Sequence, residues 1–305
     1  MGEEEVLAYQ EEESAVNAQT PTTRFMLDRI FHPSDFSQAS EVAFAHALKL
    51  ALIARAKLRL MHVALGKDDR HWSDFPGVRA TLVRWGLLPE GSAREAVEKI
   101  GLNVDKILAR MAEPVSSMLH YLDEHPTDLI VLATHQYTGV ARWVHQAVAE
   151  PMARRARTMT LFVPQGVTGF VALDTGAVTL RRILIPIDTR PRPQAAVEAA
   201  AGLARVLGCH EVAFTLVHVG ATGEMPAVHE PRQAGWAHVG WTWDRTVRRG
   251  DVVEQILAVG TACAADLIVL ATQGHHGVLD ALRGSTSERI LRGARCPVLA
   301  IPAAY

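Results

Sequence analysis

Residues 128–134 read DLIVLAT, and residues 266–272 repeat the same seven letters 138 positions later (266 minus 128). With the same offset, the segment at residues 156–164 aligns without a gap with the segment at residues 294–302. Self-similarity at a fixed offset is the sequence sign of a duplicated structural unit. The chain therefore contains two copies of one fold.

The front halves of the two copies match less closely. Residues 29–35 correspond to residues 182–188 at an offset of 153 (182 minus 29), and His62 corresponds to His218 at an offset of 156 (218 minus 62). The first copy is therefore about 18 residues longer between its second and fourth strands (156 minus 138). Proline, glycine and tryptophan residues predict an irregular excursion for this extra length, between residues 66 and 92.

Each copy alternates predicted strands and helices. The DLIVLAT runs are short and continuously apolar, as expected for strands buried on both faces. Helices are predicted at residues 37–54, 193–207 and 252–264, where alanine and leucine recur with a spacing near 3.6. This alternation predicts an α/β fold of two repeated, open, five-stranded parallel sheets, each sandwiched between helices.

Domain boundaries follow from the repeat. The expected first domain covers residues 24–165 and the second covers residues 179–303, and an acidic, disordered tail is expected at residues 1–23. The linker of about 14 residues at 165–178 is long enough, when extended, to cross a domain. We expect the domains to pair within the chain with pseudo-twofold symmetry through the last strand of each copy, around residues 160–163 and 298–301, since apolar edge strands are usually covered. A homodimer stays open as an alternative.

Composition narrows the class of protein. The chain has 305 residues, 49% hydrophobic and 21% charged, which excludes a disordered or fibrous protein. Its 31 basic and 33 acidic residues give a net charge of −2, so no basic field favours nucleic acid or a membrane surface as a partner. No apolar run reaches the roughly 18 residues of a membrane span. Three widely spaced cysteines suit a reducing cytoplasm.

A glycine-containing loop follows the second DLIVLAT run. Gly274 is followed by nine residues and then by Gly284, Ser285 and Thr286. Glycines let backbone amides approach a phosphate closely, and a helix that starts here adds unpaired N–H groups. Ser285 also stands three residues before Glu288, the spacing of a capping box, so an ordinary helix cap explains the same residues.

These residues resemble the universal stress protein family. Members that bind ATP carry a G-x2-G-x9-G-[S/T] loop after the fourth strand, an aspartate closing the first strand and a His-Val pair in the second. The second copy has the matching residues, with one exception at the first loop glycine, in the order Asp188, Val219, Ala271, Gly274, Gly284, Ser285 and Thr286. The resemblance covers about residues 24–302. It implies an adenine nucleotide alpha hydrolase-like, Rossmann-like fold that binds an adenine nucleotide.

The resemblance also assigns roles to these residues. Asp188 and Val219 would lie at the adenosine, and the loop amides and hydroxyls would hold the phosphates of ATP, with or without Mg²⁺. Ala271 adds a methyl group where the family has glycine, and this weakens the expected binding. Arg190 and Arg192, just after the first strand, either meet a phosphate or are simply solvated, and we favour solvation.

The first copy departs further from the family pattern. Its motif glycines are replaced by Ala133, Gln136 and Gln146, and its motif serine by Ala147. The phosphate loop is therefore expected to be lost. Although Asp35 and Val63 remain, so that a pocket for an adenosine-like group stays conceivable, we favour a purely structural first domain.

Other chemistries receive less support. His275 and His276 lie in the loop and His32 beside Asp35, but no H-x3-H or H-E-x-x-H spacing indicates a metal site. Neither a G-x-S-x-G elbow nor a G-x4-G-K-[S/T] loop occurs. The expected function is therefore a cytoplasmic stress-response protein that binds ATP and signals by its bound state. A scaffold without a nucleotide, and a weak ATPase in which Asp188 orients water or magnesium, are the alternatives.

Overall fold

The computed structural model describes residues 25–64, 75–110, 114–134, 158–221, 223–231, 240–272 and 286–302. The expected acidic tail at residues 1–23 lies outside the described residues, as do the loop residues at 273–285 and 135–157.

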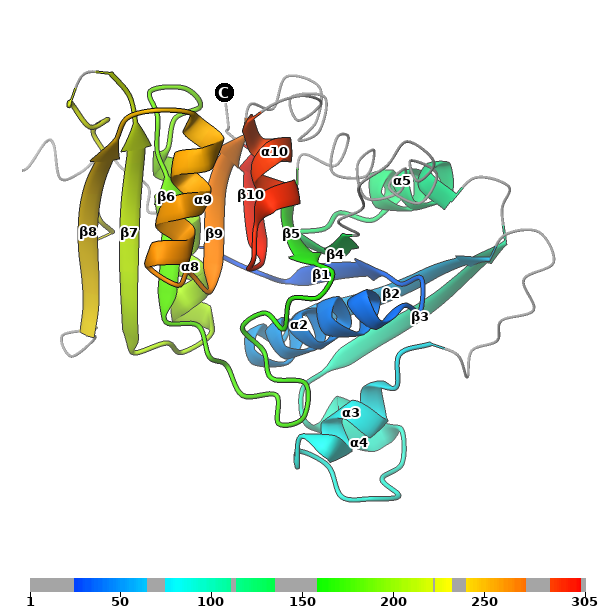
Figure 1. Cartoon of the computed structure of the whole chain (residues 1–305). Coiled ribbons are helices and arrows are strands. Elements are labelled where there is room, and N and C mark those ends of the chain that lie inside the picture. Colours follow the sequence, from blue (N-terminus) through cyan, green and yellow to red (C-terminus); the bar gives the residue numbers. More distant parts are fainter. Residues whose placement is uncertain are drawn as a thin grey trace, which may run out of the picture.

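The described strands form one ten-stranded sheet in the order β3-β2-β1-β4-β5-β10-β9-β6-β7-β8 (Figure 1). Within each copy, all neighbouring strands are parallel. Each copy therefore supplies the expected five parallel strands, and the two sets are joined into one sheet. The first copy contributes β1 (Arg29–Pro33), β2 (Lys57–Ala64), β3 (Asn103–Arg110), β4 (Leu129–Thr134) and β5 (Met159–Pro164). The second copy contributes β6 (Arg182–Pro186), β7 (Glu211–Val219), β8 (Gly240–Arg248), β9 (Leu267–Thr272) and β10 (Val298–Pro302).

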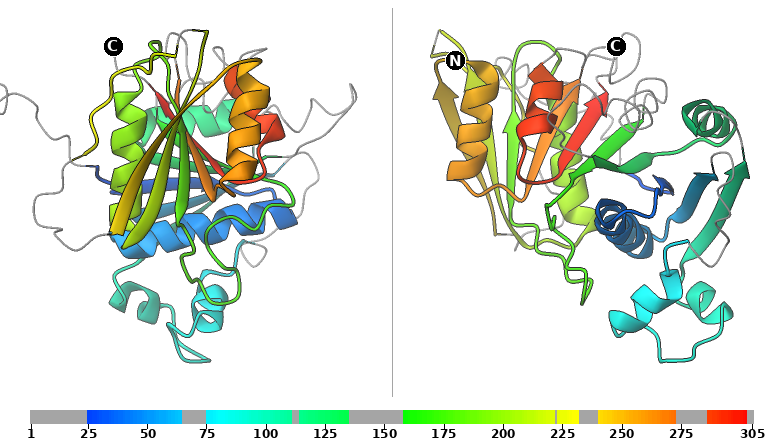
Figure 2. Two further views of the ribbon diagram at one scale, coloured as in Figure 1. Left: turned by 60° about the vertical axis from the view of Figure 1, so that its left-hand side comes forward. Right: turned by 45° about the vertical axis from the view of Figure 1, so that its right-hand side comes forward.

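Helices cover both faces of this sheet. One face carries the first long helix of each copy, α2 (Gln38–Ala54) and α8 (Gln194–Val206), which share a single hydrophobic core. The other face carries α5 (Pro114–Glu124) in the first copy and α9 (Val252–Ala262) and α10 (Thr286–Gly293) in the second. Figure 2 shows the strands of the second copy fanned out between α8 and α9. Each copy is thus an α/β sandwich, and the hydrophobic core under α2 and α8 is continuous between the two copies.

The repeated heptapeptide divides its side chains between these cores. Leu129 and Val131 of β4, like Leu267 and Val269 of β9, belong to the core shared by α2 and α8. The alternate residues face the opposite layer, against α5 in the first copy and against α9 in the second. Because successive side chains of a strand point to opposite faces, a strand buried on both faces is apolar throughout.

The aspartate that opens each heptapeptide ties two strands together. The Oδ2 atom of Asp128 accepts hydrogen bonds from the backbone nitrogens of Asp28 and Arg29 at 3.0 and 2.8 Å, and its Oδ1 pairs with the Arg29 guanidinium at 2.9 Å. Asp266 does the same at β6, with its Oδ2 at 2.9 and 2.8 Å from the nitrogens of Arg181 and Arg182. The carboxylate is therefore a structural part of the repeat.

The two copies meet at the predicted edge strands. β5 pairs antiparallel with β10, with Leu161 opposite Leu299 and Phe162 opposite Val298. Leu161 and Leu299 are also separated by the repeat offset of 138 (299 minus 161), so the pseudo-twofold axis passes through this pair. The expected pairing within the chain is confirmed.

The excursion of the first copy is partly helical, which corrects the irregular structure expected from its prolines and glycines. α3 (Val78–Arg84) forms there and α4 (Glu95–Lys99) follows just after it, and Leu82 and Val97 bury their side chains in the shared core. Apolar contacts within this core stabilise these short helices, since helices of this length are marginal alone.

The linker at residues 165–178 packs against the first copy. Phe170 is fully buried, its backbone nitrogen donates a hydrogen bond to Nε2 of His46 at 3.0 Å, and Trp85 Nε1 donates to the carbonyl oxygen of Leu173 at 2.9 Å. An isolated antiparallel bridge joins Val171 and Val178. The linker is therefore part of the first copy's core.

Candidate functional site

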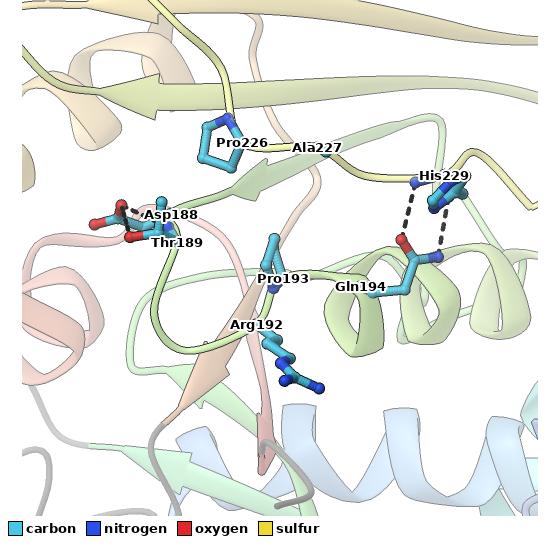
Figure 3. Close-up of a pocket in the computed structure, with 8 residues that line it drawn as sticks. All are labelled: Asp188, Thr189, Arg192, Pro193, Gln194, Pro226, Ala227 and His229. Atoms are coloured by element: carbon cyan, nitrogen blue, oxygen red, sulfur yellow. Dashed lines mark hydrogen bonds between the residues drawn. The ribbon is translucent and has the colours of Figure 1, made fainter. Parts of the chain in front are cut away.

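A cavity of about 340 Å³ opens at the carboxyl ends of β6 and β7. One wall is the turn after β6 with the start of α8, and the other is the segment that follows β7 (Figure 3). Open α/β sheets bind ligands at this place, beyond the carboxyl ends of their strands. The lining residues are Asp188, Thr189, Arg192, Pro193, Gln194, Pro226, Ala227 and His229.

Asp188 is the predicted site residue that the structure places at the cavity. Its side chain is exposed, and its Oδ1 accepts a hydrogen bond from the backbone nitrogen of Thr189 at 2.7 Å. Among the described residues, only Thr189 donates to this carboxylate. The carboxylate therefore keeps acceptor capacity for a donor such as a hydroxyl group.

Gln194 fixes the opposite wall of the cavity. Its Oε1 accepts from the backbone nitrogen of His229 at 2.9 Å, and its Nε2 donates to the carbonyl oxygen of the same residue at 3.0 Å (Figure 3). Arg245 of β8 donates to Glu230 at 3.2 Å from the other side. Because α8 and β8 both hold this segment, the cavity has a defined second wall.

Arg192 lines the cavity from the turn before α8 and is exposed. Its guanidinium points away from Asp188 and Pro226 (Figure 3). This orientation agrees with the solvated interpretation of the arginine.

Of the other predicted site residues, the three that the structure describes do not line this cavity. Val219 ends β7 and packs against the core cluster of α9. Ala271 lies within β9 opposite Ile301, so it belongs to the strand ladder. Thr286 is the exposed first residue of α10. Gly274, Gly284 and Ser285 lie outside the described residues, as do His275 and His276.

The start of α10 is held beside α9. Asp251 caps α9 by accepting from the backbone nitrogens of Val253 and Glu254, both at 3.0 Å, and Arg289 of α10 pairs with the same carboxylate at 3.3 Å. The Glu254 N–H, with the Arg289 guanidinium, lowers the pKa of Asp251. α10 is thereby held against the start of α9.

The equivalent turn of the first copy begins with the same contacts, since in the second copy the backbone nitrogen of Ile187 donates to the Val217 carbonyl at 2.8 Å. The backbone nitrogen of Ser34 donates to the Met61 carbonyl at 2.8 Å, and its carbonyl is 2.7 Å from Nδ1 of His62. His218 makes the same contact with the carbonyl of Ile187 at 3.0 Å. The two repeated histidines therefore fix the turns after the first strands, as expected for buried structural histidines.

Two further histidines of the first copy are buried and uncharged. His32 bonds the Val131 carbonyl through Nδ1 at 2.9 Å, and His46 bonds the Val42 carbonyl through Nδ1 at 2.8 Å. Burial lowers the pKa of each to about 4. Among the described residues no group of three or more His, Cys, Asp or Glu side chains has a metal-binding arrangement, so a metal role for His32 gains no support.

Sequence reasoning missed the second wall of the cavity. Pro226, Ala227 and His229 belong to no motif, and Gln194 is an ordinary helix residue by pattern. The available signal was positional, because the turn after the first strand and the segment after the second strand meet at one edge of a parallel sheet.

The Universal stress protein family model matches residues 26–164 and 179–302. Solved structures share the fold along most of the chain. A universal stress protein from Archaeoglobus fulgidus DSM 4304 has a TM-score of 0.58 at 16% identity, covering 91% of this chain and 99% of its own. A functionally unknown protein from Pseudomonas aeruginosa PAO1 has a TM-score of 0.58 at 12% identity, covering 92% and 95%. No curated protein sequence matches the chain. None of the helices in the described part of the chain is long and apolar enough to cross a membrane.

Proposed function

Because the chain belongs to the universal stress protein family, we propose that its second copy binds an adenine nucleotide, ATP, and that this binding acts as a signal in a stress response. The proposal places one nucleotide on each chain. The proposal also places the protein in the cytoplasm, which agrees with its three free cysteines.

The observation that carries the proposal is the cavity beside Asp188. Its volume of about 340 Å³ is at the lower end of the roughly 300–1,000 Å³ of small-molecule sites. A nucleoside fits such a volume, and the Asp188 carboxylate supplies an acceptor for ribose hydroxyl groups. The phosphates would extend out of this cavity.

The start of α10 supports a place for those phosphates. Gly284 and Ser285 directly precede Thr286, the first residue of that helix. The first N–H groups of a helix have no partner within the helix and carry the positive end of its dipole, which favours an anion. In the proposal, these amides and the Ser285 and Thr286 hydroxyls hold the phosphates.

The experiment is calorimetric titration of the full chain with ATP, with and without Mg²⁺. We expect one site per chain, and we expect Gly284→Gln to weaken binding by more than about 100-fold, or about 3 kcal/mol. The glutamine copies Gln146 of the first copy and fills the space proposed for the phosphates. The melting temperature should change little, because the substitution lies at a helix start.

The matched control is Gln146→Gly, which makes the reverse change in the first copy and should leave ATP affinity unaltered. Nucleotide released from the purified protein on denaturation, identified by chromatography, gives an independent check. Unchanged affinity in a folded Gly284→Gln chain would refute the phosphate assignment. Loss of binding in the Gln146→Gly chain would place the ligand in the first copy instead of the second.

A further inference from the structure

The residue that follows the first-strand aspartate differs in character between the copies. Thr189 follows Asp188 and lines the cavity of the second copy. At the repeat offset of 153 (189 minus 36) the first copy has Phe36 after Asp35. A small polar side chain at a ligand wall is thus replaced by an aromatic ring.

Phe36 adopts a backbone conformation that large side chains rarely adopt. Its φ is 60°, in the left-handed region where a bulky L-residue is an outlier. This conformation places its ring 4.2 Å from the His62 ring and 5.7 Å from the Phe75 ring, measured between centroids. Phe75 is 3% exposed and Phe36 is half-buried, so the group is shielded from solvent on the Phe75 side.

Hydrogen bonds on both sides hold the strained turn. Ser34 Oγ accepts from the backbone nitrogen of Phe36 at 3.3 Å and contacts Ser40 Oγ at 3.0 Å, while Oδ1 of Asp35 accepts from the Ser37 nitrogen at 3.0 Å. The second copy has Ile187 and Pro193 at the positions of Ser34 and Ser40. A strained residue persists only where its surroundings determine it so fully, and such residues concentrate at functional sites.

Phe75 enters this group from the segment after the second strand. The corresponding segment of the second copy, with Pro226 and His229, forms the far wall of the open cavity. Both walls of the ligand position therefore have counterparts in the first copy, and both contribute a phenylalanine ring. Lys106 of β3 lies over the Phe75 ring, with its Nζ 5.7 Å from the ring centroid.

We propose that Phe36 and Phe75 occupy the ligand position of the first copy, so that this copy is permanently filled by side chains of its own chain. The first copy then stays in one closed state, and only the second copy changes between empty and occupied. The two copies, which are joined through β5 and β10, then form a pair in which the first is fixed and the second responds to a ligand.

The test opens the first copy and asks whether a ligand enters. Phe36→Gly combined with Phe75→Ala removes both rings, and the glycine also relieves the positive φ. We expect the melting temperature of the full chain to fall by roughly 10 °C, the scale of one buried phenylalanine lost. Phe36→Gly alone, which keeps the buried Phe75 ring, should be more stable than the double variant, and it provides the second variant for this test.

Two probes are used, adenosine and indole, both in the Gly284→Gln background. Adenosine rests on the proposed function, whereas indole tests only an aromatic-sized space. Histidine ring NMR signals, with His62 assigned by substitution, report binding at the first copy. We expect the His62 signal of the double variant to shift with millimolar probe, and the signal of the parent chain to stay unchanged.

Phe31→Ala is the matched control, since Phe31 is equally large, fully buried and in the adjacent strand, but packs on the opposite face beside Tyr121. Its His62 signal should not respond to either probe. The proposal is overturned if the His62 signal of the parent chain moves with a probe, or if a folded double variant takes neither. Binding of indole without adenosine supports a filled position and counts only against the nucleoside assignment.

Discussion

The first and second copies share a frame and differ at the carboxyl ends of their strands. Asp128 and Asp266 make matching bonds to the start of β1 and β6, and the two heptapeptides divide their side chains between cores in the same way. At the strand ends, the rings of Phe36, His62 and Phe75 pack together in the first copy, whereas the second copy has an open cavity. The strand cores are therefore alike in the two copies, and the difference lies in the turns at the strand ends.

The largest expected difference between the copies is in how their stability responds to acid. His32 and His46 are buried in the first copy with pKa values lowered by burial from 6.5 to about 4, and Ile185 and Ala199 occupy the equivalent positions. Between pH 6.5 and pH 4 the unfolded chain binds protons that the folded chain does not, so the free energy of unfolding decreases as pH falls. Each histidine contributes about 3 kcal/mol to this loss. Hydrogen exchange at pH 7 and pH 4.5, corrected for intrinsic rates, should show loss of protection mainly in the first copy.

The matched variant is His32→Ile, which installs the residue of the second copy. It should remove about half of the pH dependence of the first copy's protection. Equal loss of protection in both copies at pH 4.5 would contradict the assignment to these two histidines.

A smaller effect is expected where the copies touch through a glycine. Gly202 lies in the middle of α8, and a Cβ atom there would stand 2.4 Å from Cβ of Phe25, which precedes β1. The equivalent residue of α2 is Lys49, whose ammonium lies 5.5 Å above the Trp85 ring. Gly202→Val should lower the free energy of unfolding by about 2 kcal/mol through overpacking, measured in urea.

The second variant for this contact is Phe25→Ala, combined with Gly202→Val in a double-mutant cycle. Removing the ring should restore much of the lost stability. Additive effects of the two substitutions would show that Phe25 does not fill the space over Gly202.

The smallest effect concerns the first turn of the equivalent helices. Gln194 holds the cavity wall by two bonds to His229, while the side chain of the equivalent Glu41 forms an exposed pair with Arg84 at 3.6 Å. Gln194→Ala should cost about 1 kcal/mol of stability and weaken ATP binding several-fold. Glu41→Ala should change stability by less than about 0.5 kcal/mol and leave ATP binding unchanged. Thermal unfolding and calorimetry measure both, and equal effects of the two substitutions would remove the special role of Gln194.

Much of the fold was predictable because it depends on local pattern. The duplication, the parallel strands and the pairing of β5 with β10 follow from repeated apolar runs that must be buried. The helices α3, within the excursion, and α4, just after it, could not be predicted in this way, because tertiary contacts of Leu82 and Val97 stabilise them. At the candidate site, Asp188 was predictable from its motif, but Gln194 and His229 were not, since no motif connects them.

The sequence by itself determined that the chain is a duplicated α/β protein, because burial on both faces of a strand leaves a periodic record in the residues. It also determined which copy retains the loop glycines. Only the tertiary structure showed that the turn after the first strand packs against other aromatic rings in the first copy and lines a cavity in the second. Phe36 and Thr189 occupy the same repeat position, and their different surroundings depend on the folding of segments that are distant in sequence, such as Phe75 and the 223–231 segment. Contacts between such segments are set by packing in space, which local sequence pattern does not encode.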